Sequence, residues 1–280
     1  MTSGQSGRLR RSSFRNLKGL TLSRMHELNS RVPGQEVIAK LMEVRQQDAD
    51  VSLLGRVFGA DPLSAEARPW YRGALGEVAV GRLLAALGPE WTVLHAVPVG
   101  AGTSDIDHVL IGPPGVFTIN TKNHSDQSVW VAGRTLMVAG QRQRHIPNAA
   151  HEAARAGKLL SAASGTPVEV AGVVVVIAPK NLTIRKVPDG AKVLTDRQLL
   201  RWLQSLRPVL AVDQVYRIAS VAGMPRTWHR NPGQQTDPVE LQHRFNALRD
   251  QVDRARQRRL LWVLAAFLGF FSMIFLGPFF

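Results

Sequence analysis

A run of β-branched residues in the middle of the chain limits the folds that this sequence can adopt. Residues 168–179 read VEVAGVVVVIAP, with no charged side chain after Glu169. Such a continuous apolar run is typical of a strand that is buried on both faces of a sheet. The Ala-rich segment 148–164 has helical composition and indicates a crossover into this strand. We therefore expect an α/β fold, in which a mixed β-sheet is flanked by helices on both faces.

Strand-like segments also precede that crossover, at 91–99, 106–112 and 116–121. The turn Pro113–Gly115 joins the last two and predicts a hairpin. A second hairpin is predicted within 128–140, turning at Gly133–Arg134. Helices are predicted at 64–87 and 196–206 from their apolar spacing.

These elements give a plan for the whole chain. We expect a basic, disordered arm, a helical lead-in, a main domain, a helical or linker segment and a C-terminal membrane anchor, at 1–32, 33–69, 70–206, 207–259 and 260–280.

The predicted hairpin brings together side chains that suit phosphodiester chemistry. Residues two apart in a strand share a face, so Asn120 and Lys122 are expected to point the same way. Asp107 lies on the preceding strand and reaches the same patch, whereas His108 is expected on the opposite face. Glu77, on the helix ahead of the sheet, is a fourth candidate. Magnesium held by carboxylates activates water and neutralises phosphate charge, and a nearby lysine stabilises the charge that develops.

Two segments resemble a known family. RGALGEVAVGRLLAAL, containing Gly76–Glu77, and SDIDHVLIGPPGVFTINTKNH are similar to the nuclease-related domain family, NERD, over about residues 70–180. That family resembles a branch of the restriction-endonuclease-like PD-(D/E)xK fold, so the resemblance implies a fold of this kind. It also implies a nuclease that depends on Mg²⁺ or Mn²⁺ and acts on DNA or RNA. The implied metal ligands are Glu77, Asp107 and the residue at position 120, with Lys122 as the motif lysine.

Asn120 departs from the family pattern, because it stands where the second acidic ligand belongs. An amide carbonyl can bind magnesium but brings no negative charge, and it cannot act as a general base. Three functions therefore remain open: a working nuclease, a degenerate module that binds nucleic acid without cleaving it, and a scaffold for a protein partner.

The charge and composition of the chain limit the classes of molecule that it can bind and the kinds of site that it can contain. The chain has 35 Lys and Arg against 21 Asp and Glu, a formal net charge of +14, which favours polyanions. Residues 1–32 hold seven of these cations and only one acid, so we expect this arm to bind nucleic acid or anionic lipid. The chain has no cysteine, which excludes disulfides, thiolate metal sites and a cysteine nucleophile. His108 and His124 do not share a zinc-ligand spacing, so no zinc site is assigned to them. The oligomeric state is left open.

The C-terminal segment 260–280 reads LLWVLAAFLGFFSMIFLGPFF and contains no charged residue. A helix of about 20 apolar residues spans a bilayer. Four arginines directly precede the segment, at positions 254, 256, 258 and 259, and would hold the main domain on the cytoplasmic side. The sequence therefore predicts a single transmembrane helix and a cell-membrane location.

Overall fold

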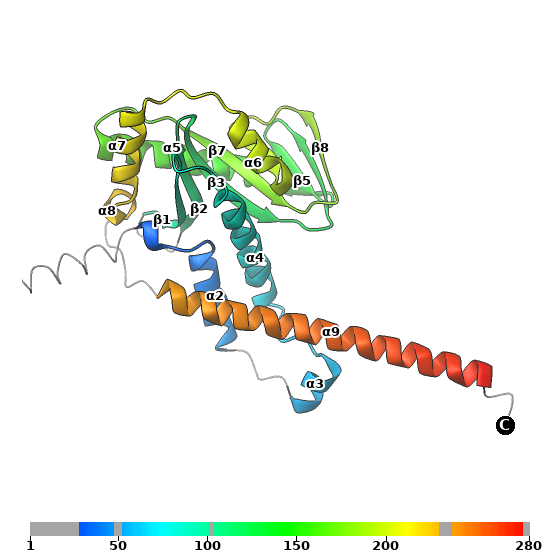
Figure 1. The fold of residues 1–280 in the computed structure, drawn as a ribbon. Helices are drawn as coiled ribbons and strands as arrows, with labels where there is room; N and C mark the ends of the chain where they lie inside the picture. Colours follow the sequence, from blue (N-terminus) through cyan, green and yellow to red (C-terminus); the bar gives the residue numbers. More distant parts are fainter. Residues whose placement is uncertain (1–27, 48–51, 101–103, 230–236, 277–280) are drawn as a thin grey trace, which may run out of the picture. The chain divides into compact units, whose positions relative to one another are not determined.

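The computed structural model describes residues 28–47, 52–100, 104–229 and 237–276, with the side chains of the last segment described only to residue 272 (Figure 1). The chain forms two compact units. The sheet unit consists of residues 1–34 and 75–235, and the helical unit of residues 35–74 and 236–280. Residues 1–27 of the predicted basic arm lie outside the described residues. The arm and the other boundaries expected from the sequence stay predictions.

Sheet A, the first of two sheets in the sheet unit, has the strand order β1-β2-β3-β7-β9. Its strands are β1 (Thr92–Pro98), β2 (Asp105–Gly112), β3 (Gly115–Asn123), β7 (Val170–Ile177) and β9 (Lys192–Thr195). The β1–β2 and β2–β3 pairs are antiparallel, whereas β3–β7 and β7–β9 are parallel. The predicted mixed sheet is therefore confirmed.

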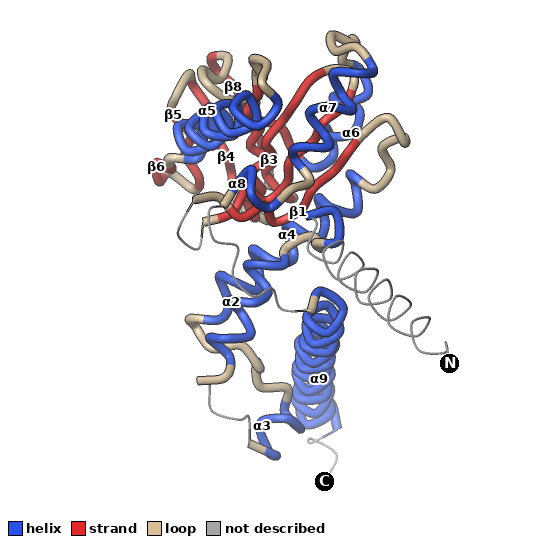
Figure 2. Tube along the Cα trace, turned by 90° about the vertical axis from the view of Figure 1, so that its left-hand side faces the viewer, coloured by secondary structure: helices blue, strands red, loops and turns tan. Residues whose placement is uncertain are grey.

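Helices cover both faces of sheet A (Figure 2). On one face, Val80 and Leu84 of α4 (Ala67–Leu84) pack with Val173 and Val175 of β7. On the other face, buried residues of α5 (His145–Ser164) pack with the alternate β7 side chains, Val174 and Val176. Strand β7 is thus buried on both sides, which explains its unbroken β-branched sequence.

Sheet B continues from the carboxyl ends of β3 and β7 and has the order β6-β5-β4-β8. Its strands are β4 (Ser128–Ala132), β5 (Thr135–Val138), β6 (Gln141–Gln143) and β8 (Asn181–Lys186). The β4–β5 hairpin turns at Gly133–Arg134, as predicted. Strands β6, β8 and β9 were not predicted, because they are short and lack a clear apolar pattern.

The other helices of the sheet unit are α6 (Asp196–Ser205), α7 (Val212–Ala222), α8 (Pro225–Trp228) and the short 3₁₀ helix η1 (Leu28–Ser30). The backbone N–H of Thr195 donates to the side chain of Gln198, which fixes the start of α6 where the sequence predicts a helix. Leu28 and Trp228 are buried in a core with Ile218 and Ala222 of α7.

His95 on β1 and His108 on β2 form a buried cross-strand pair, with their Nδ1 atoms 2.8 Å apart. One neutral ring must donate to the other, because two protonated nitrogens would repel. His108 is fully buried, and it lies on the face opposite Asp107, as the strand period predicts. Burial lowers the pKa of His95 to about 4.

This pair should make the fold sensitive to acid. The folded pKa of His95 lies below its unfolded value near 6.5, so the unfolded chain binds more protons between these values and stability falls as pH decreases. From pH 7 to pH 5 the expected loss is about 2 kcal/mol from His95 alone. Urea unfolding at the two pH values measures it, and His95→Gln should show a smaller decrease. An equal decrease in wild type and variant would contradict this assignment.

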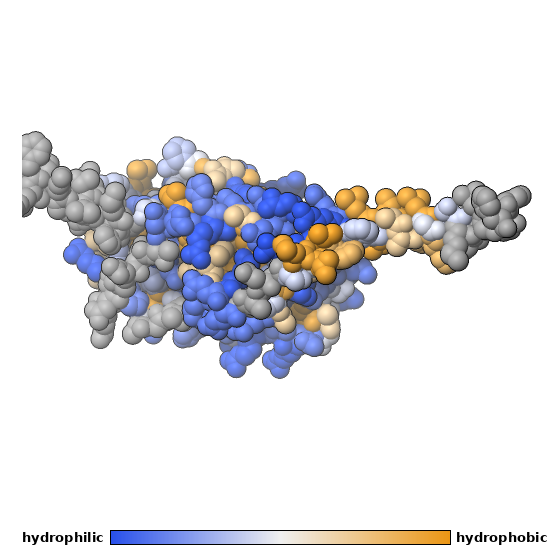
Figure 3. All heavy atoms as spheres, turned by 90° about the horizontal axis from the view of Figure 1, so that it is seen from below, coloured by the Kyte–Doolittle hydropathy of each residue, from blue (hydrophilic) through white to orange (hydrophobic). Residues whose placement is uncertain are grey.

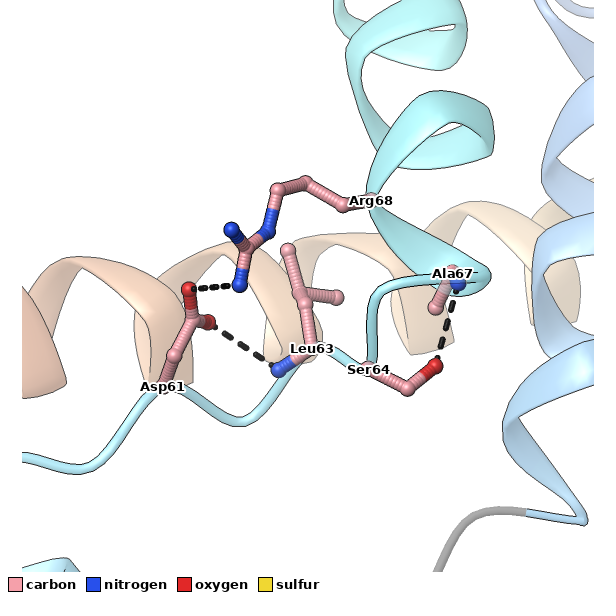
Figure 4. Close-up of polar contacts among 5 residues, drawn as sticks. All are labelled: Asp61, Leu63, Ser64, Ala67 and Arg68. Carbon is pink, nitrogen blue, oxygen red and sulfur yellow. Dashed lines mark hydrogen bonds and ion pairs between the residues drawn. The ribbon is translucent and has the colours of Figure 1, made fainter.

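The helical unit contains α2 (Gln35–Arg45), α3 (Leu53–Phe58), the first part of α4, and α9 (Pro238–Leu276). Figure 4 shows how α4 begins: the Ser64 hydroxyl accepts a hydrogen bond from the Ala67 N–H at 3.1 Å. Asp61 binds both the Leu63 N–H and the Arg68 guanidinium nearby. The Ser64 contact satisfies an N–H group of the first turn that has no partner within the helix itself.

The C-terminal helix does not support the predicted membrane anchor. The apolar side chains of α9 gather near its C-terminal end, where those from Leu260 to Phe271 are exposed (Figure 3). Within the described side chains, no helix is both long and apolar enough to cross a membrane. The helix predicted here is present as far as Leu276, but the predicted transmembrane span at 260–280 and the membrane location based on it are not supported; residues 277–280 lie outside the described residues.

Candidate active site

The candidate site lies where β2 separates from β3. The pairing of the two strands ends at His108 and Ile119, whereas β3 continues alongside β7 as far as Asn123. The N–H of Thr121 therefore lies beyond the last β2 pair, and the Asp107 carboxylate accepts its hydrogen bond at 2.6 Å. This bond holds the Asp107 carboxylate at the point where the two strands separate.

Asn120 and Lys122 lie on the same face of the sheet as Asp107, by the register and the strand period. Helix α5 covers this face and contributes a residue that sequence reasoning missed. The Asn120 amide donates to both carboxylate oxygens of Glu152, each at 2.9 Å. A signal for Glu152 was present in the sequence, because it is the only acidic residue in α5.

Helix α4, which carries Glu77, approaches this end of β3 from the other face. A Cβ placed on its neighbour Gly76 would lie 3.3 Å from the Thr121 methyl group and 3.4 Å from the Asn123 Cβ. Those two side chains alternate with Asn120 and Lys122, so α4 packs on the face opposite α5. The structure thus brings Asp107, Asn120 and Lys122 together, whereas Glu77 is buried on α4, the helix that packs on the opposite face of β3.

Electrostatic interactions connect four residues into one cluster: Asp107, Asn120, Lys122 and Glu152. Burial raises the pKa of Asp107, and the positive charge of Lys122 and the Thr121 hydrogen bond oppose that shift. Burial also raises the pKa of Glu152, and the negative charge of Asp107 raises it further, against the Asn120 hydrogen bond and Lys122. Two partly desolvated carboxyl groups therefore share a single lysine, and the arrangement favours binding of a further cation.

A pair of histidines lies beside this cluster. The Nε2 atoms of His124, which follows β3, and His145, the first residue of α5, are 2.9 Å apart with the rings stacked. Burial lowers the pKa of His145 to about 4, assisted by the charges of Lys122 and His124. His145 and Glu152 are two helical turns apart, so both lie on the α5 surface that faces β3. The histidine pair and the Asn120–Glu152 pair thus flank Lys122.

The residues present fit a hard divalent cation. Asn120 is only 6% exposed, and its carbonyl oxygen has no hydrogen-bond partner among the described residues. A buried carbonyl beside two carboxylates is the oxygen-rich ligand set that Mg²⁺ and Mn²⁺ take. In the described part of the chain, no three His, Cys, Asp or Glu side chains form such a group, so this set depends on the amide oxygen of Asn120.

The fold and this cluster define the class: an α/β domain whose acidic residues and lysine meet at the end of a mixed sheet. Comparison with known proteins agrees. Residues 72–177 match the model of the nuclease-related domain family, and they form a nuclease-related domain. The resemblance expected from the sequence is confirmed for this part of the chain.

One curated relative is an uncharacterized protein of Bacillus anthracis, which is 39% identical over 69 residues. The match covers 23% of this chain, and the chain spans about a third, 31%, of the relative. No solved structure matches this chain at a significant level.

Proposed function

We propose that the nuclease-related domain is a metal-dependent phosphodiesterase that cleaves nucleic acid, with DNA as the first substrate class to test. The observation that carries the proposal is the Asn120–Glu152 pair beside Asp107 and Lys122. Glu152 supplies the negative charge that Asn120 lacks, so the site retains two acids, an amide oxygen and a lysine. The order of sheet A, with helices on both faces, also fits the restriction-endonuclease-like arrangement that the resemblance implies.

In this proposal Asp107, Glu152 and the Asn120 carbonyl hold Mg²⁺ or Mn²⁺. When bound, the metal lowers the pKa of a water ligand and neutralises charge on the scissile phosphate. The Thr121 N–H fixes one oxygen of Asp107, so its other oxygen can point toward the metal. Asn120 holds Glu152 with its NH₂ group while its carbonyl remains a ligand.

Lys122 lies in the field of both carboxyl groups. Its ammonium group would bind a phosphate oxygen and stabilise the extra negative charge of the transition state. Glu77, on the opposite face, would support this end of β3 from behind rather than complete the metal site.

The test is cleavage by the full chain of labelled DNA and RNA, single- and double-stranded, with Mg²⁺, with Mn²⁺ and with EDTA. We expect cleavage with either metal and loss of cleavage with EDTA, because the remaining groups cannot alone activate water near neutral pH. Nucleic-acid binding without any cleavage would favour the degenerate binding module. The absence of both would favour a protein-interaction scaffold.

A further inference from the structure

The open face of sheet B carries an exposed tryptophan in a cationic setting. The buried side chains of β4 and β5 point inward to the core shared with α5; they are Val129, Val131, Leu136 and Val138. The alternate side chains therefore point outward. Trp130, at the middle of β4, is 37% exposed, an unusual position for a large aromatic side chain on a small sheet.

The strand register places the neighbours of Trp130. Trp130 is opposite Thr183 of β8 on one side and Met137 of β5 on the other, and Met137 is opposite Arg142 of β6. These side chains form one row across the outer face, with neighbouring strands about 4.8 Å apart. In the next row, Lys186 of β8 is opposite Ala132. The aromatic ring thus has an exposed cation on either side.

The charged residues within the strands of sheet B and the β4–β5 turn are all cationic. Residues 128–143 and 180–187 contain five cationic residues and no acid: Arg134, Arg142, Lys180, Arg185 and Lys186. The nearest acidic residues in sequence, Asp126 and Asp189, lie in the loops that flank these strands. The Asp189 N–H donates to the Gly133 carbonyl at 3.2 Å, so this acid lies at the β4–β5 turn, at the edge of the surface. A surface with an excess of cations and an exposed aromatic ring is complementary to a polyanion that carries planar bases.

Sheet B is also attached firmly to the candidate active site. Strand β4 follows the site strand β3 after a short loop, and β8 follows β7 in the same way. The two loops are joined by backbone hydrogen bonds, from Asp126 N–H to the Ala178 carbonyl at 3.1 Å and from Lys180 N–H to the Gln127 carbonyl at 2.9 Å. A ligand on sheet B would therefore be held in a fixed relation to the end of β3.

We propose that the outer face of sheet B binds single-stranded nucleic acid, with a base stacked on Trp130 and the neighbouring phosphates bound by Arg142 and Lys186. The proposal extends the proposed function and rests on it for the polymer class. Stacking requires an unpaired base, so a single strand should bind better than a duplex. The surface would hold the substrate on one side of the cleavage site, on a part of the fold that the metal site does not use.

The test measures binding of labelled oligodeoxythymidine to the full chain by fluorescence anisotropy in EDTA, so that cleavage cannot interfere. Trp130→Ala should weaken binding about 5- to 150-fold, the range for loss of one stacked base. Trp130→Phe should recover most of that loss. Arg142→Ala should reduce the salt dependence by about 0.7 in log–log slope. The control Trp70→Ala removes a tryptophan of equal exposure, 38%, from the helical unit and should leave the affinity unchanged.

The outcomes separate this proposal from the proposed function. Tight binding that requires Trp130, without metal-dependent cleavage in wild type, would support the surface and reject the nuclease. If wild type cleaves nucleic acid but Trp130→Ala binds the oligonucleotide as tightly as Trp70→Ala does, the binding surface is rejected and the nuclease is not. An equal affinity for duplex, or a Trp130-dependent affinity for anionic phospholipid vesicles in place of DNA, would also overturn the proposal.

Discussion

Glu152→Gln should strongly weaken manganese binding and cleavage, and adding Asn120→Asp in the same chain should restore much of both. The two substitutions keep the shape of each side chain, because Gln replaces Glu and Asp replaces Asn. Together they move the negative charge from position 152 to position 120. In wild type the amide of Asn120 holds the carboxylate of Glu152. In the double variant the amide of residue 152 would hold the carboxylate of residue 120, with the same hydrogen bonds and net charge.

The expected size of the first effect follows from the ligand set. The site has two carboxylates, and loss of one halves the negative charge that binds the cation. We expect manganese affinity to fall at least about tenfold and cleavage to fall about 100-fold or more. The single variant Asn120→Asp should place two carboxylates in contact, which raises their pKa values and shifts metal binding to higher pH.

Isothermal titration with Mn²⁺ and a cleavage assay measure the four proteins, with thermal unfolding as a check of folding. Glu169→Gln is the matched control, because Glu169 is exposed and lies away from the cluster. A wild type that binds no Mn²⁺, or a Glu152→Gln variant that binds it as well as wild type does, would refute the role of Glu152. A folded double variant that regains neither property would show that position 120 cannot carry the charge.

Lys122→Ala should reduce cleavage about 100- to 1000-fold and leave manganese affinity equal or higher. Removal of one group that stabilises transition-state charge typically costs that much in rate. The same substitution removes a positive charge near the carboxylates, and therefore it cannot weaken their attraction for a cation. Single-turnover cleavage at saturating metal measures the first effect, and titration calorimetry measures the second.

The control for this experiment is Lys158→Ala, because Lys158 is an exposed lysine on α5. It should cleave at the wild-type rate. If Lys122→Ala cleaves nearly as fast as this control, the lysine acts only as a structural residue at the strand end. If both cleavage and metal binding disappear while the fold is intact, Lys122 is needed to assemble the ligand set rather than to stabilise the transition state.

Sequence alone was sufficient for the main elements of the sheet unit and for part of the site. The β-branched run of β7 required burial on both faces, and the turn at Pro113–Gly115 fixed the β2–β3 hairpin. The period of two then put Asn120 and Lys122 on one face with Asp107, and His108 on the other. These are local properties, because one strand period and one turn determine which side chains share a face.

Tertiary packing decided what lies opposite those residues. Glu152 is 32 positions beyond Asn120, and the pattern of an Ala-rich helix does not determine which of its sides faces the sheet. Gly172 permits that packing, since a Cβ at this position would lie 2.7 Å from the Ala149 carbonyl oxygen. α5 can therefore lie close against β7 and direct Glu152 toward Asn120. The acid that the hairpin lacks is therefore supplied by another element. Buried polar groups need hydrogen-bond partners, and the fold brings the Glu152 carboxylate and the Asn120 amide close enough to pair.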